Sequence, residues 1–207
     1  SYAIEFMDGW EDPPDLVIAN ALSVLNNALE RNPDNPLALV TLGLFKTGMC
    51  DYDNGYAMAR HGYELGSDSF DIVGMYIFSA VVCGKCEEAK QAVIDLTNHF
   101  PDLDAWHVNM LGFYYFAAGD LQESMKATLA AVERNSSYLI AHVQLAFTYA
   151  ALGQIGEAQE AVRTLLRLNA NYSSERIRMT LVFKDQEVLE KIIDDLQAAG
   201  LPEAVSV

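Results

Sequence analysis

The sequence predicts an all-α protein, a right-handed solenoid of helix–turn–helix repeats closed by a C-terminal capping helix. Two observations carry this prediction. Small residues that open a helix recur at steps of 34 or 35 residues, and they are Ala21, Gly55, Ala89, Ser124 and Ala158. The turn glycines Gly84, Gly119 and Gly153 repeat with the same period. A repeat of this length cannot bury its apolar face alone, so neighbouring copies have to stack on a shared core.

The clearest copy of the repeat spans residues 139–169. Apolar residues recur there at three- and four-residue steps before and after Gly153, which places them on one face of each of two helices. Ala158 and Ala161 open the second helix with little side-chain bulk, so that it can cross the first helix closely. The stretch therefore predicts two amphipathic helices joined by a tight turn.

Five such units are expected to form a single domain over residues 1–207. Their boundaries are 2–35, 36–69, 70–104, 105–138 and 139–172. Because the chain begins with Ser1 in the middle of an apolar pattern, we expect it to be a piece of a longer protein. Within the second unit, Gly55 and Gly62 lie in the second helix, and each costs up to about 1 kcal/mol relative to alanine. That helix is therefore expected to be the least stable.

The pattern changes after residue 172, and residues 173–203 are expected to cap the solenoid. Ser173 and Asp185 can each accept hydrogen bonds from the first turn of a following helix. Gly200 and Pro202 then end the last helix. The apolar residues of that helix recur at i, i+3, i+4 and i+7, and they are Leu189, Ile192, Ile193 and Leu196. We expect them to pack against the second helix of the fifth unit.

The charge balance argues against several classes of partner. The formal net charge is −16, from 13 basic and 29 acidic residues. Such a surface repels phosphate backbones and anionic lipid, so we expect neither a nucleic acid nor a membrane as partner. The alternative is that the acidity simply keeps an apolar solenoid in solution. No apolar run approaches the roughly 18 residues of a membrane span, and three cysteines without a secretory signal fit a reducing, cytoplasmic location.

Few residues suggest chemistry. Cys83 and Cys86 form a CxxC on the turn of the third unit, and Cys50 lies near the equivalent turn of the unit before it. A second CxxC or a paired histidine would suggest zinc, but neither accompanies it, so we interpret these cysteines as small residues filling turn positions. No phosphate-binding, dinucleotide-binding or nucleophile motif occurs. We therefore predict a non-enzyme without metal or cofactor.

The register of small residues, together with Pro33 and Pro101 at the ends of two units, resembles the tetratricopeptide (TPR) repeat. A narrower resemblance covers residues 139–203. It ends in Phe183-Lys184-Asp185, a helix, and a terminal Ala-Gly-Leu-Pro-Glu at 199–203, as in the C-terminal TPR region of bacterial class III adenylate/guanylate cyclases. The resemblance implies a regulatory region downstream of a catalytic domain, in a bacterial signalling protein. Similar repeats also follow winged-helix domains in bacterial transcriptional regulators. A regulator of that kind is therefore an alternative parent protein for this region.

In TPR arrays the first helices of successive units line a concave groove, and the register indicates which residues of this chain would line it. They are Leu44, Phe78, Trp106, Asn109, Phe113, Phe116 and Phe147. Of the Lys, Arg and Asn residues that grip an acidic peptide terminus in some family members, only Asn109 has a counterpart here. An apolar, aromatic trough remains, and exposed patches of this size usually bind something.

Two kinds of function fit such a trough. The first is an interaction module that binds an amphipathic helix of a partner, or the chain's own residues 2–10 in cis or in a homodimer. The second is a sensor of a small apolar ligand. The alternative to both is that these rings merely pack between adjacent helices.

Overall fold

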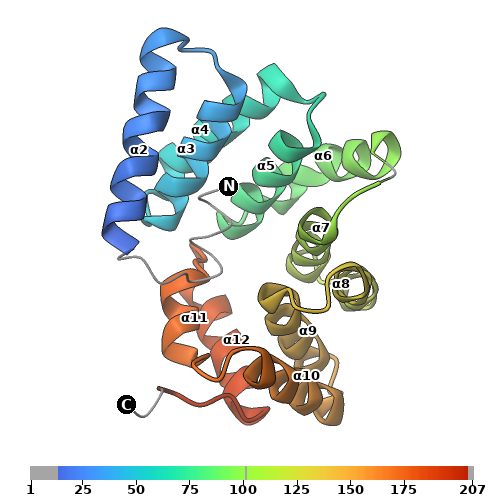
Figure 1. The fold of residues 1–207 in the computed structure, drawn as a ribbon. Helices are drawn as coiled ribbons and strands as arrows, with labels where there is room; N and C mark the ends of the chain where they lie inside the picture. Colours follow the sequence, from blue (N-terminus) through green and yellow to red (C-terminus); the bar gives the residue numbers. More distant parts are fainter. Residues whose placement is uncertain (1–13, 101, 205–207) are drawn as a thin grey trace. The chain divides into compact units, whose positions relative to one another are not determined.

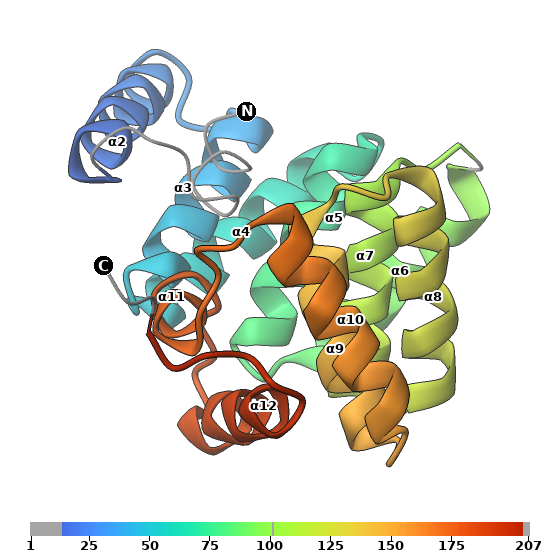
Figure 2. The same cartoon turned by 60° about the horizontal axis from the view of Figure 1, so that its bottom comes forward.

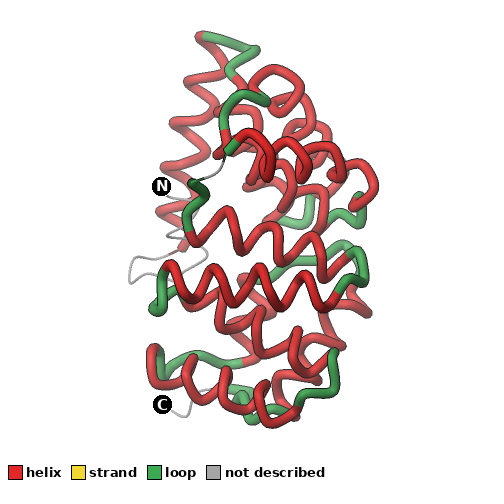
Figure 3. Tube along the Cα trace, turned by 90° about the vertical axis from the view of Figure 1, so that its right-hand side faces the viewer, coloured by secondary structure: helices red, strands yellow, loops and turns green. Residues whose placement is uncertain are grey.

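The computed structural model of the chain describes residues 14–100 and 102–204. These residues form α-helices and no strand, as Figure 1 and Figure 3 show. The helices are α2 (Pro14–Arg31), α3 (Pro36–Gly48), α4 (Tyr52–Gly66), α5 (Phe70–Val82), α6 (Cys86–His99), α7 (Ala105–Ala117), α8 (Leu121–Arg134), α9 (Leu139–Ala151), α10 (Ile155–Leu168), α11 (Ser174–Thr180) and α12 (Gln186–Ala198). The all-α class is confirmed. Among the described residues, no helix is long and apolar enough to span a bilayer.

The helices divide at residue 101 into two compact units. In the first unit, α3 packs against α4 and α5 against α6, and α3 also contacts α2 and α5. In the second unit, α7 packs against α8 and α9 against α10, with further contacts from α8 and α7 to α9. Figure 2 shows α9 and α10 side by side. Each unit thus contains two helix pairs in the order that the 34-residue period predicts.

The small residues of the register lie where paired helices cross closely. A Cβ atom built on Gly43 of α3 would lie 2.6 Å from Gly55 O and 2.6 Å from Ala59 N. In the second unit the same role falls to Ser124, a fully buried residue whose hydroxyl donates to Gly112 O at 2.9 Å. Ala158 is also fully buried. The close-contact positions read from the sequence are therefore confirmed.

The turns inside the helix pairs share one backbone conformation. Gly84, Gly119 and Gly153 have φ angles of 71°, 82° and 74°, in the left-handed region that glycine adopts without steric cost. The α3–α4 turn has the same conformation at Cys50, with φ at 64°. Cys50 is the one residue other than glycine with a positive φ among the residues that the structure describes.

The C-terminal cap forms, but its main neighbour differs from the prediction. Leu189, Ile192, Ile193 and Leu196 of α12 are all buried. The backbone of α12 runs closest to α9, the first helix of the last pair, and not to α10. The sequence prediction named the wrong helix because an apolar stripe shows which face of α12 is buried and not which helix covers it.

Within the cap, hydrogen bonds from the end of α12 and the residues after it hold α11 in place. The backbone N–H groups of Ser174 and Glu175 donate to the carbonyls of Pro202 and Glu203, at 2.9 and 3.0 Å. The amide of Gln197 donates to the Ser174 hydroxyl at 2.9 Å. These bonds satisfy first-turn N–H groups that would otherwise lack partners. The terminal stretch is therefore a structural part of the cap.

Candidate functional site

The seven predicted groove residues lie on four helices of two units. Leu44 of α3 and Phe78 of α5 belong to the first unit, and both are buried. Trp106, Asn109, Phe113 and Phe116 form one stripe of α7, and Phe147 lies on α9 in the same unit. We call these last five residues the α7–α9 face. Only this face brings several of the predicted residues together within one unit.

The rings of the α7–α9 face pack against one another. Phe147 meets Phe113 with 6.0 Å between ring centroids and meets Phe116 edge-on at 4.6 Å. Phe113 and Phe147 have no exposed surface, while Phe116 and Trp106 are half-buried. The burial of Phe113 and Phe147 agrees with the alternative that these rings fill the space between adjacent helices. Trp106 and Phe116 are the two rings of the face that solvent reaches.

Two side chains of the α7–α9 face carry buried polar atoms. Asn109 is fully buried, and neither its Nδ2 nor its Oδ1 has a hydrogen-bond partner among the described residues. The indole Nε1 of Trp106 is buried and also without a partner in that part of the chain. Leaving a buried hydrogen-bonding group unpaired costs about 1–3 kcal/mol. The face therefore carries two donors and one acceptor that nothing in the described chain uses.

A second buried amide was missed by the sequence analysis. Gln144 of α9 is fully buried, and neither atom of its amide has a partner among the residues described. Its Nε2 lies 2.5 Å from where a Cβ on Gly112 would stand, so Gln144 fills the space that the glycine leaves open. The one available signal was a glutamine between Val143 and Leu145 in an otherwise apolar helix. Periodicity alone gave no reason to single it out.

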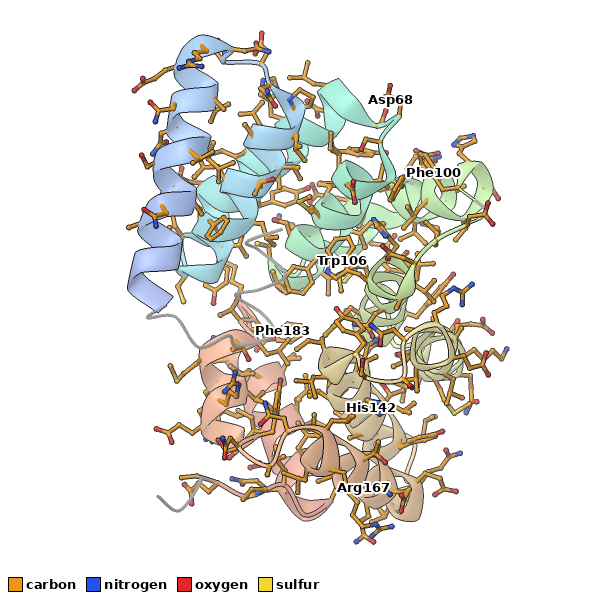
Figure 4. All side chains as sticks on the ribbon, in the orientation of Figure 1. Asp68, Phe100, Trp106, His142, Arg167 and Phe183 are labelled. Atoms are coloured by element: carbon orange, nitrogen blue, oxygen red, sulfur yellow. The ribbon has the colours of Figure 1, made fainter. Side chains whose placement is uncertain are left out.

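The start of α7, which carries Trp106 and Asn109, is held by an N-terminal cap. Asp104 accepts the backbone N–H of His107 at 3.0 Å, and its carboxylate lies 2.8 Å from His107 Nδ1. Burial alone would raise the pKa of Asp104, but the hydrogen bonds from His107 outweigh it and leave that pKa lowered. Figure 4 shows Trp106 on this first turn. Its ring meets the His107 ring edge-on, with centroids 4.7 Å apart.

The first unit contains a row of tyrosine–carboxylate hydrogen bonds that the sequence analysis did not predict. Tyr56 and Tyr63 of α4 donate to Glu88 and Asp95 of α6, at 2.5 and 3.0 Å. Tyr76 of α5 stacks on Tyr63, with centroids 4.5 Å apart. Burial and the bond to Asp95 raise the pKa of Tyr63 to about 12. These phenols therefore stay protonated at neutral pH and join the second helices of neighbouring pairs.

The described residues contain no group of three or more His, Cys, Asp or Glu side chains placed to hold a metal ion. Cys50 is exposed, Cys83 is buried and Cys86 is partly buried, and these three cysteines are not joined by disulfides. The CxxC of the sequence thus lies on the α5–α6 turn.

Comparison with known proteins supports the repeat assignment. Residues 140–172, which cover most of α9 and all of α10, match the tetratricopeptide repeat family. Among solved structures, the chain is similar to PilW, a type IV pilus biogenesis factor, with a TM-score of 0.64 and 17% identity over 95% of this chain and 85% of that one. The fold is that of tetratricopeptide-repeat proteins. No curated protein sequence matches the chain.

Two further TPR structures are similar. The thermophilic TPR protein TTC0263 of Thermus thermophilus has a TM-score of 0.60 and 16% identity, over 79% of this chain and 86% of that one. YrrB, described as a TPR protein with an unusual peptide-binding site, has a TM-score of 0.52 and 17% identity, over 84% of this chain and 90% of that one. At these identities the likeness establishes the fold.

Proposed function

We propose that the chain is a non-catalytic interaction module that binds a protein segment at the α7–α9 face. The observation that carries this proposal is the buried amide of Asn109, which has no hydrogen-bond partner among the described residues. The indole N–H of Trp106, on the same stripe of α7, also has none there. A ligand that paired with these atoms would recover the free energy that their burial costs. Trp106 and Phe116, the half-buried rings, are where contact with a partner begins.

The chemistry of Asn109 favours an extended segment over an amphipathic helix. Its amide offers one acceptor and a donor group, which is the complement of a peptide main chain. In a helix the main-chain groups are already bonded to one another, so a docked helix presents only side chains. A small apolar ligand, the second function considered from the sequence, would leave the Asn109 amide unpaired. An extended peptide would pair with it once the side chains that bury it move aside.

The occupant of the site is either a partner protein or the chain's own residues 2–10, in cis or in a homodimer. Those residues lie outside the described part of the chain. We further propose the regulatory context that the tail at 139–203 suggests, a C-terminal region of a bacterial, cytoplasmic, cyclase-like signalling protein. The division into five repeats of one domain belongs to the same proposal.

A binding experiment tests the module. Peptides selected from a random library against the full chain are measured for their dissociation constants with the wild type and with Asn109→Leu. We expect Asn109→Leu to weaken binding about 5- to 150-fold, the effect of losing about 1–3 kcal/mol of hydrogen bonding. Asn26→Leu, on the exposed face of α2, is the control. Equal affinities for wild type and Asn109→Leu would reject the site.

A further inference from the structure

Four large apolar residues lie where helices of the first unit begin or end. Leu37 and Phe70 lie in the first turns of α3 and α5. Leu65 lies in the last turn of α4, and Phe100 directly follows α6. The exposed fractions are 51% for Leu37, 46% for Leu65 and 42% for Phe70, and Phe100 is half-buried. We call these four residues the apolar edge.

Two contacts bring these helix ends together. A Cβ atom on Gly66, the last residue of α4, would lie 2.8 Å from Pro36 Cβ and 2.7 Å from Ile72 Cδ1. Because Pro36 begins α3 and Ile72 lies in the first turn of α5, the end of α4 packs against the starts of both helices. The ring of Phe70 meets that of Phe100 edge-on, with centroids 5.8 Å apart. The exposed apolar residues are therefore gathered in one region of the first unit.

Acidic side chains flank the apolar edge. Asp68 and Asp71 lie within two residues of Phe70 in the chain, and both are exposed. Asp34 is also exposed, and its carboxylate lies 3.6 Å from the His61 ring of α4. An apolar centre with a negatively charged rim is complementary to a partner that carries apolar and cationic side chains together.

The apolar edge differs from the α7–α9 face in what it offers a partner. No buried side-chain nitrogen or oxygen of the described first unit lacks a hydrogen-bond partner. Nothing there calls for the main chain of an extended peptide. A helix bonds its main-chain groups internally and presents side chains alone, so it fits a surface of this kind.

We propose that the apolar edge binds a basic amphipathic helix of a partner protein. Its apolar side chains pack on Leu37, Leu65 and Phe70, and its lysines or arginines lie beside Asp68 and Asp71. A second copy of this chain does not suit the edge, because at a formal net charge of −16 two copies repel each other. The inference concerns the first unit and is independent of the α7–α9 face.

A fluorescent model peptide tests the apolar part of the edge. It is a helix of about 14 residues, roughly four turns, with leucines at i, i+3, i+4 and i+7 and lysines elsewhere. A second peptide has glutamate in place of every lysine. Fluorescence anisotropy measures the dissociation constant of each peptide with the full chain. We expect the lysine peptide to bind and the glutamate peptide not to bind.

Variants then locate the binding. Phe70→Ser should weaken binding of the lysine peptide about 5- to 30-fold, the range for an apolar residue that contributes to an interface. Leu37→Ser, a second variant of the edge, should weaken it in the same way. Ile155→Ser is the matched control, because Ile155 also begins a helix, α10, and is 48% exposed. It should bind as the wild type does.

A pair of double variants tests the charged rim. Asp68→Asn with Asp71→Asn should weaken binding severalfold and make it less sensitive to salt. Glu133→Gln with Asp194→Asn removes the same number of charges from exposed positions of the second unit. This control should leave the affinity unchanged. Equal losses in the two double variants would show a general attraction to an acidic chain and would overturn the proposal.

Three further results would overturn it. One is equal affinity for the wild type, Phe70→Ser and Leu37→Ser. Another is loss of binding in Asn109→Leu, which would place the peptide on the α7–α9 face instead. The third is a dimer of the chain alone in sedimentation that Phe70→Ser converts to a monomer, since a second copy would then be the occupant.

Discussion

The crossing of α3 and α4 depends on residues that lack a side chain. A Cβ on Gly55 would lie 2.7 Å from Gly43 O and 2.7 Å from the backbone nitrogen of Thr47. Neither is the movable end of a side chain, so the helices would have to separate. Gly48, at the end of α3, has open space around it.

Gly55→Ala is therefore expected to destabilise the first unit by about 1–3 kcal/mol, the usual cost of forcing extra volume into a packed site. Gly48→Ala should be neutral or stabilising by up to about 1 kcal/mol, because alanine favours the helix. Urea unfolding followed by circular dichroism compares the two variants. If both substitutions had the same effect, close backbone contact would not explain the regular spacing of small residues along this chain.

Asp104 is a single residue whose contribution to stability depends on pH. Its pKa in the folded protein is lowered below the ordinary value of 3.8. The cap bonds to His107 therefore stabilise α7 fully above pH 3.8, and this contribution is lost as the pH falls through the lowered folded pKa.

Replacing Asp104 with alanine should cost about 0.5–2 kcal/mol at pH 7, as for other N-terminal caps. As the pH falls below 3.8 and through the lowered folded pKa of Asp104, the difference from wild type should shrink, since the wild-type carboxyl then becomes protonated. Unfolding measured at a series of pH values from 7 downward gives the comparison. A difference that stayed constant between pH 7 and the most acid condition would show that the charge of Asp104 is unimportant.

Among the helices, α12 packs against the rest of its unit through a single apolar stripe. Leu196 is fully buried on that stripe, whereas Val188 on the same helix is 36% exposed. Leu196→Ala is expected to cost about 2–5 kcal/mol, and Val188→Ala much less, because only the first leaves a cavity. Chemical unfolding of the two variants measures the difference. Equal losses would mean that α12 is not packed through this stripe.

The sequence predicted the elements well because their periods are local. The 34-residue steps located the helix pairs, and the predicted unit of residues 105–138 contains α7 and α8. The neighbour of α12 could not be predicted in this way. An apolar stripe shows which face of a helix is buried, but it does not show which other helix covers that face. The same limit applies at the site. The register placed Asn109 and Phe113 on one stripe, but their complete burial depends on the surrounding helices.

The chemistry of the turns was also beyond the sequence. The 34-residue register marks Cys50 as the counterpart of Gly84, but only the backbone shows that it adopts a positive φ. Its contact with Tyr52, and that of Cys83 with the same residue, come from packing between consecutive helix pairs. These contacts join residues that are distant in the sequence, and no sequence motif predicts them.

At the scale of the molecule, each of the two units is a set of stacked helix pairs that carries little local chemistry in its described residues. The formal net charge of the chain is −16, because acidic side chains outnumber basic ones. Trp106, Asn109 and Gln144 stand out because their buried polar atoms lack partners within the described chain. We therefore propose that a protein segment is recognised on one face of the second unit.

The most direct test observes the Asn109 amide itself. In a ¹⁵N-labelled full chain, the side-chain NH₂ resonances of Asn109 are assigned by their loss in Asn109→Leu, and a selected peptide is then added. We expect these resonances to shift downfield and to exchange more slowly with solvent as the peptide binds, while those of Asn26 on α2 do not move. A peptide that binds and leaves the Asn109 resonances unchanged would contradict the account.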